Sequence, residues 1–164
     1  MSNRRVCVFN QTRQSFLSLD TSVADTQLAR LRGLLGRREL KSDHGLWLVP
    51  CQGIHTIGLL FPIDVVWLDA DHRVVHVTEY LQPFRITSIR RNCHSVLELP
   101  VRTIFESETQ AGDQITFFSA SDHEYATNGA LEEEVQGASE PDTAVAVAPD
   151  RAAMELNEGL EPGS

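Results

Sequence analysis

Residues 51–69 read CQGIHTIGLLFPIDVVWLD, and this stretch carries the most structural information in the chain. It places Cys51 and His55 beside a long apolar run, followed by Pro62 and Asp64 at the start of a predicted strand. Burying a polar side chain without a partner costs roughly 1–3 kcal/mol. We therefore expect these polar groups either to find partners or to line a binding site.

Short apolar runs separated by turn residues predict a mostly β structure on both sides of this stretch. The predicted strands cover 6–9, 16–19, 46–49, 63–68, 74–78, 95–99 and 115–118. Residues 10–12 separate the first two strands, and residues 69–72 separate the fourth and fifth. Both connecting segments have turn composition, so we expect two antiparallel hairpins.

One helix is predicted after the first hairpin, and a short helix or turn over residues 102–109. Asp25 or Thr26 can cap the first helix, Gly36 can end it, and Gly33 inside it indicates close packing. Four leucines at helical spacing predict an apolar stripe that faces the core: Leu28, Leu31, Leu34 and Leu35. The pattern as a whole indicates an α+β fold dominated by strands.

Charge divides the chain into two parts. Residues 1–120 carry 13 Arg and Lys residues and 12 Asp and Glu residues, whereas residues 121–164 carry one Arg and 11 acidic residues. The second part has one aromatic residue, Tyr125, and cannot bury enough apolar surface to offset the entropy of ordering. We expect a single globular domain over residues 1–120 and a disordered acidic tail over residues 121–164.

Cysteine content and hydropathy indicate the cellular setting. Three cysteines, Cys7, Cys51 and Cys93, are too few for a disulfide framework. No apolar run approaches the ~18 residues that a membrane helix needs. The apolar run near the N-terminus stops at Asn10, too early for the core of a signal peptide. We expect a soluble, cytoplasmic protein without a membrane span.

Metal and cofactor chemistry lack a signature in the sequence. Cys51, His55, Cys93 and His94 are residue types that zinc favours, but adjacent Cys93 and His94 would point to opposite faces of a strand. The glycine motifs that bind phosphates or dinucleotides are absent from the sequence. We therefore predict no metal site and no cofactor.

A hydrolase-type enzyme is one alternative function. Cys51 could act as the nucleophile and His55 as its base, with Asp64 orienting the imidazole. The sequence around them has no glycine-rich oxyanion loop and no nucleophile elbow. A purely structural explanation also fits, in which His55 and Asp64 hydrogen-bond to the backbone of nearby loops.

An arginine-mediated nucleic-acid binder, restrained by the acidic tail, is a second alternative. Of the 14 basic residues, 13 are arginine. Two clusters could contact phosphates: Arg30, Arg32, Arg37, Arg38 and Lys41, and Arg85, Arg90 and Arg91. The nearly neutral charge of residues 1–120 and the lack of a known nucleic-acid motif argue against this function.

An ordered set of short motifs extends over the predicted domain. The motifs are RLRGLLGR (30–37), IHT (54–56), FPIDVVWLD (61–69), RVV (73–75), VLELP (96–100) and GDQI (112–115). In this order they resemble the prokaryotic family called domain of unknown function 192, over about residues 5–118. The resemblance implies a small barrel-like antiparallel or mixed sheet with one or two short helices, and it transfers no established activity.

The resemblance also implies a set of recurrent polar positions, which fall here on Arg32, Arg37, His55, Thr56, Asp64 and Glu98. Relatives often carry a basic residue before the Phe-Pro pair, where this chain has Leu60. Our leading hypothesis is a non-catalytic module that binds a small ligand or a protein partner through a polar patch formed by these residues.

Overall fold

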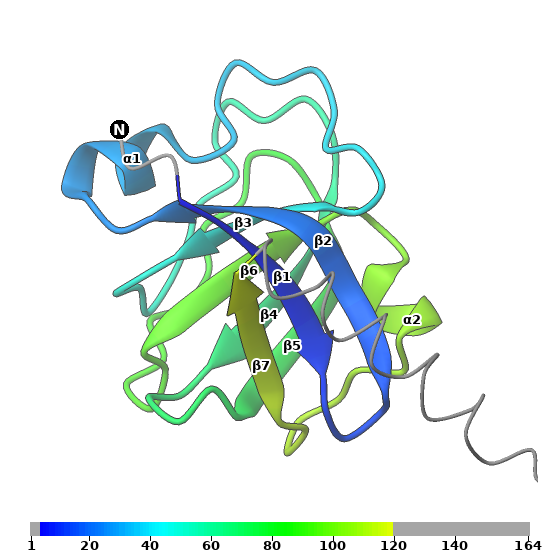
Figure 1. Cartoon of the computed structure of the whole chain (residues 1–164). Helices are drawn as coiled ribbons and strands as arrows, with labels where there is room; N and C mark the ends of the chain where they lie inside the picture. Colours follow the sequence, from blue (N-terminus) through cyan, green and yellow to red (C-terminus); the bar gives the residue numbers. More distant parts are fainter. Residues whose placement is uncertain (1–3, 120–164) are drawn as a thin grey trace, which may run out of the picture.

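The computed structural model describes residues 4–119 and places them in one seven-stranded mixed sheet with two short helices (Figure 1). The strands are β1 (Arg5–Asn10), β2 (Ser15–Ala24), β3 (His44–Leu48), β4 (Ile63–Leu68), β5 (Val74–Leu81), β6 (Ser95–Leu99) and β7 (Ile115–Ser119). The helices are α1 (Gln27–Arg32) and α2 (Thr103–Glu106). The predicted mostly β, α+β fold is confirmed, and the predicted tail at 121–164 lies outside the described residues.

The sheet has the strand order β5-β4-β6-β3-β2-β1-β7, and β2–β3 is its parallel pair. Both predicted hairpins are confirmed, because β1 pairs with β2 and β4 pairs with β5 in antiparallel fashion. The sheet curls into a half barrel, and its two edges meet at one end. There Arg73 and Gln114 form a bridge, and the Val74 N–H donates to the Asp113 carbonyl oxygen at 2.9 Å.

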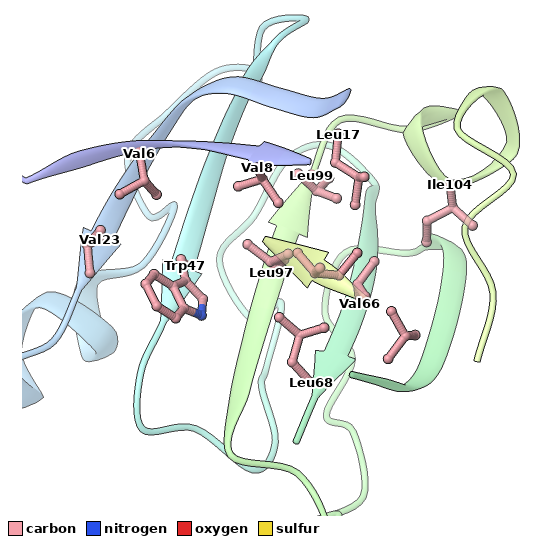
Figure 2. Packing of buried hydrophobic residues seen from close by; sticks show 12 residues of the cluster. Val6, Val8, Leu17, Val23, Trp47, Val66, Leu68, Leu97, Leu99 and Ile104 are labelled. Atoms are coloured by element: carbon pink, nitrogen blue, oxygen red, sulfur yellow. The ribbon is translucent and has the colours of Figure 1, made fainter. Parts of the chain in front are cut away.

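Strands β3, β4 and β6 bury side chains on both faces of the sheet, because successive side chains of a strand point in opposite directions. The inner core fills the curl, and Figure 2 shows its side chains pointing toward one another: Val6, Val8, Leu17, Val23, Trp47, Val66, Leu68, Val74, Leu97, Leu99, Ile104 and Ile115. The outer core lies on the other face: Ala24, Leu34, Leu40, Leu46, Leu48, Ile54, Leu59, Ile63, Val65, Trp67, Cys93 and Val96.

Helix α1 is shorter than predicted, and its predicted apolar stripe is wrong in the first half. Thr26 caps its start, but Gly33 takes a positive φ of 47° and ends the helix after six residues. Leu28 and Leu31 are 80% and 65% exposed. Leu34 does reach the outer core, and it does so because the chain leaves the helical path at Gly33. No helix within residues 4–119 is long and apolar enough to cross a membrane.

A buried polar network fixes the end of the sheet where β1 stops and β7 starts. The Asn10 side-chain amide donates to the Asp113 carboxylate at 2.9 Å and to the Thr109 hydroxyl at 3.0 Å. Its oxygen accepts the backbone N–H groups of Thr12 and Arg13, at 3.1 and 3.0 Å. A single fully buried side chain therefore joins the first hairpin to the loop before β7.

We expect Asn10→Leu to lower the free energy of unfolding by about 3 kcal/mol, because it leaves several buried donors and acceptors unpaired. Urea unfolding followed by tryptophan fluorescence measures this loss, since Trp47 and Trp67 report on the inner and outer cores. The exposed Gln11→Ala is the control. Equal stability of the two variants would contradict the structural role of Asn10.

Candidate functional site

A cavity of about 320 Å³ lies over the outer face of the sheet, beneath α1 and the loop that follows β3. Its walls are mostly apolar: Leu31, Leu34, Leu35, Leu48, Ile54 and Leu59. Six lining residues carry polar or reactive side chains: Gln27, Arg30, Arg32, Cys51, His55 and Glu98. Such a mixture of apolar walls and a few convergent polar groups is typical of small-ligand sites.

A glycine allows the loop after β3 and the segment after α1 to approach each other beside this cavity. Gly58 has a φ of +84°, which side-chain-bearing residues rarely adopt. A Cβ atom at this position would lie 2.8 Å from Cδ2 of Leu35, which is one of the cavity walls. The close approach of these two segments therefore depends on glycine.

Glu98 lines the cavity from the middle of β6. In the ladder it lies opposite Leu46 of β3 and Val65 of β4, two members of the outer core. Its neighbours Leu97 and Leu99 point into the inner core, because successive side chains of a strand point to opposite faces of the sheet. Glu98 is 4% exposed, and its Oε2 atom has no hydrogen-bond partner among the described residues.

The protonation of Glu98 follows from this burial. Burial disfavours the charged carboxylate and raises the pKa of Glu98 to about 8, although the positive charge of Arg37 acts in the opposite direction. At neutral pH the side chain is therefore mainly a neutral carboxylic acid, which can donate one hydrogen bond and accept others. The cavity thus holds a buried group that can both donate and accept.

Arginine side chains make the surroundings of the cavity cationic. Arg30 is half-buried and donates to the carbonyl oxygens of Asp25 and Val49, at 3.0 and 3.2 Å. These bonds tie α1 to the end of β3 and hold the guanidinium group beside the cavity. Arg32 is exposed at the edge of the lining, and the exposed Arg37 acts on Glu98 through its charge.

Cys51 and His55, the residues of the hydrolase alternative, both line the cavity. The Cys51 thiol donates to the Gly53 carbonyl oxygen at 3.1 Å. Burial raises the pKa of this thiol above its ordinary value, so it is protonated at neutral pH. A cysteine nucleophile needs the opposite shift, toward the thiolate. His55 is exposed, and its backbone forms an isolated bridge with Ile86.

Asp64 lies on the opposite face of the sheet from Glu98. It pairs with Leu99 in the ladder and so points to the inner core. Its Oδ1 atom accepts the Tyr80 N–H at 2.9 Å, and Oδ2 accepts the Ile104 N–H at 3.0 Å. The carboxylate therefore anchors β5 and α2, and it does not orient the imidazole of His55.

Thr56 is also buried away from the cavity. Its hydroxyl donates to the Gln82 carbonyl oxygen at 2.7 Å and accepts the Arg85 N–H at 2.9 Å. It thereby joins the loop before β4 to the loop after β5. Of the six predicted positions, the structure brings Arg32, His55 and Glu98 to the cavity and Arg37 close to it, and places Thr56 and Asp64 elsewhere.

Sequence reasoning missed the role of Arg30, which it treated only as one member of a basic cluster. The hydrogen bond from Arg30 to Val49 joins residues 19 positions apart, so no local sequence pattern reveals it.

Within residues 4–119, no group of three or more His, Cys, Asp or Glu side chains is arranged to hold a metal ion.

Comparison with known proteins identifies relatives of the whole described part. The family DUF192, described as "Uncharacterized ACR", matches residues 8–117. A UPF0127 protein of Thermococcus kodakarensis is 29% identical over 125 residues, which cover 73% of this chain and 78% of that protein. A UPF0127 protein of Thermococcus gammatolerans is 29% identical over 116 residues, covering 67% of this chain and 74% of that protein.

Two crystal structures share the fold. One is a putative transcription regulator of Sinorhizobium meliloti, with a TM-score of 0.61 and 22% identity, covering 70% of this chain and 92% of that one. The other is a protein of unknown function from Novosphingobium aromaticivorans, with a TM-score of 0.59 and 19% identity, covering 68% of this chain and 83% of that one. At these identities the likeness concerns the fold alone.

We expect Asp64→Ala to lower the free energy of unfolding by about 2–4 kcal/mol, because two backbone N–H groups lose their acceptor. Urea unfolding measures the loss, and the exposed Glu39→Ala serves as control. A loss of less than about 0.5 kcal/mol would contradict the anchoring role of Asp64.

The raised pKa of Glu98 makes stability depend on pH. Between about pH 5 and 8 the folded chain holds a proton that the unfolded chain has released, so wild-type stability falls as pH rises through this window. The Glu98→Gln side chain does not titrate, so its stability does not fall in this way. We expect its free energy of unfolding to rise relative to that of the wild type by up to about 1.4 kcal/mol for each pH unit in this window. Urea unfolding at pH 5, 6, 7 and 8 tests this, with the exposed Glu106→Gln as control. Parallel curves for wild type and Glu98→Gln would mean that Glu98 is already ionised at pH 5.

Proposed function

Because this chain belongs to DUF192, whose relatives are described as uncharacterised, we propose its function from the cavity itself. The domain is a non-catalytic module that binds a small ligand over the buried carboxyl group of Glu98. The ligand lies between α1, the loop after β3 and the outer face of the sheet. The polar patch of the leading hypothesis is then Arg32, His55 and Glu98, supported by Arg30 and Arg37.

The unpartnered oxygen of Glu98 carries this proposal. Nearly every buried polar atom of a folded protein has a hydrogen-bond partner, and an unpaired one costs about 1–3 kcal/mol. The Oε2 atom of Glu98 has none among the described residues, and the side chain lines a cavity of about 320 Å³. A ligand with a hydroxyl, carbonyl or amide group at its buried end would supply that partner.

The other residues that line the cavity indicate the chemical character of the rest of the ligand. Leucine and isoleucine side chains form most of the wall, so the body of the ligand is apolar. Arg30 and Arg32 favour an anionic group such as a carboxylate where they reach the lining. The ligand class is therefore a small amphiphilic acid with a second polar group at its buried end.

We propose a non-catalytic module because of the states of Cys51 and Asp64. The half-buried Cys51 thiol has a raised pKa, which opposes nucleophilic attack. Asp64 uses both carboxylate oxygens on the far side of the sheet. His55 therefore lacks both an activated nucleophile and the orienting carboxylate of the hydrolase alternative.

A matched pair of probes tests the role of Glu98. We expect 6-hydroxyhexanoate to bind the wild-type protein about fivefold more tightly than hexanoate, because its hydroxyl group gains one hydrogen bond in the cavity. Calorimetric titration measures both affinities. In Glu98→Leu the two acids should bind equally, and in the surface variant Glu106→Gln the fivefold difference should remain.

Native mass spectrometry of the gently purified full chain gives an independent measurement. We expect a retained small molecule on the wild-type protein and none on Glu98→Leu. A clean mass for the wild type, together with equal affinities for the two acids, would contradict the proposed function.

A further inference from the structure

Two loops beside the cavity form an ordered surface. Residues 51–62 and 82–91 are joined by backbone hydrogen bonds: Thr56 N–H to Arg85 O at 2.8 Å, Phe84 N–H to Thr56 O at 2.9 Å, Thr87 N–H to Ile54 O at 2.9 Å, and Arg90 N–H to Gln52 O at 2.8 Å. The Thr87 hydroxyl adds a side-chain link by accepting the Ile54 N–H at 2.9 Å. The two loops therefore hold each other in one arrangement.

These loops expose apolar side chains that no described element covers. Five large apolar residues on them are between 48% and 76% exposed: Ile57, Leu60, Phe84, Ile86 and Ile89. Ile57, Ile86 and Ile89 line one hollow of about 440 Å³. We call these five residues, together with Arg85 and Arg91, the loop surface. Exposed apolar side chains gathered in this way mark interaction sites on soluble proteins.

The cationic residues of the loop surface indicate the charge of its partner. Arg85 and Arg91 are exposed, and neither forms an ion pair with another residue of the range 4–119. Arg90 is half-buried, with its guanidinium group 5.1 Å from the centre of the Trp67 ring. A partner with apolar side chains next to carboxylates would complement both features.

The chain itself contains such a segment. Residues 131–135 read LEEEV, so Leu131 and Val135 flank three consecutive glutamates. Residues 121–164 as a whole carry 11 acidic residues and one arginine. Twelve residue steps separate Ser119, the end of β7, from Leu131, and an extended chain of that length spans up to about 40 Å. A domain of this size is about 35 Å across, so the segment can reach the loops.

We propose that residues 131–135 dock onto the loop surface of the same chain. Leu131 and Val135 contact the hollow lined by Ile57, Ile86 and Ile89, and the glutamates pair with Arg85 and Arg91. The hollow shares Gly53, Ile54 and His55 with the cavity over Glu98. A docked segment would therefore lie beside the cavity, whether or not the cavity binds a small ligand.

Photo-crosslinking in the full chain tests the docking. We expect p-benzoylphenylalanine at position 136 to crosslink to residues 52–61 and 82–91 of the same molecule. The same probe at position 146, between Val145 and Val147, is the matched control and should not favour these loops. Mass spectrometry of the digested protein maps the crosslinks.

A reciprocal charge exchange tests the ion pairs. Arg85→Glu with Arg91→Glu should lower the crosslinking yield by about fivefold, because two attractive pairs become repulsive. Adding Glu132→Arg and Glu134→Arg to that variant should restore the yield. The combined variant also controls for misfolding, because the crosslinking yield would not be restored if the Arg85→Glu and Arg91→Glu substitutions had disrupted the loop surface.

Two results would overturn the proposal. One is an equal distribution of crosslinks from positions 136 and 146. The other is crosslinking between different molecules in a mixture of ¹⁴N- and ¹⁵N-labelled protein, which would identify a second copy of the chain as the occupant of the loop surface.

Discussion

Burial of the same strands on both faces governs this structure. Every residue of β4 and β6 is buried, and so are four of the five residues of β3. The half barrel encloses the inner core by curling, but the outer face of these strands needs a separate cover. Helix α1, the residues after it and the loop between β3 and β4 supply that cover. The cavity exists because this irregular cover does not fill the space above the strands as closely as the curled sheet fills its inside.

Two-sided burial also explains why two carboxylates in adjacent strands behave differently. Asp64 points inward, and each of its two side-chain oxygens accepts a backbone N–H group. Glu98 points outward beneath the cover, where its Oε2 atom receives no donor from residues 4–119, and burial keeps the side chain mostly neutral at pH 7. One step along the ladder thus separates a structural anchor from a group available to a ligand. The face of the sheet, more than the residue type, decides which role a carboxylate takes.

Much of the fold could be predicted from local pattern, and the site only in part. The strands and both hairpins follow from apolar runs and turn residues, and the alternation of side chains along a strand puts Glu98 on the face opposite to Leu97 and Leu99. The length of α1 could not be predicted, because Gly33 ends it through a φ angle that composition does not reveal. The grouping of Arg30, His55 and Glu98 depends on contacts across tens of residues. The sequence also suggested one polar patch that contains both Asp64 and Glu98. The pairing of β4 with β6 puts them on opposite faces of the sheet, and this pairing is set by the tertiary structure.

The meeting of the two sheet edges has a consequence for solubility. An open sheet presents unpaired N–H and C=O groups along its outer strands, and these can template pairing with another chain. Here β5 and β7 begin side by side, and the N–H groups of Val74 and Ile115 donate to the carbonyl oxygens of Asp113 and His72, at 2.9 and 3.0 Å. Each edge thereby occupies backbone groups of the other. At this end, therefore, fewer backbone groups of the two edge strands are free to pair with a strand of another chain.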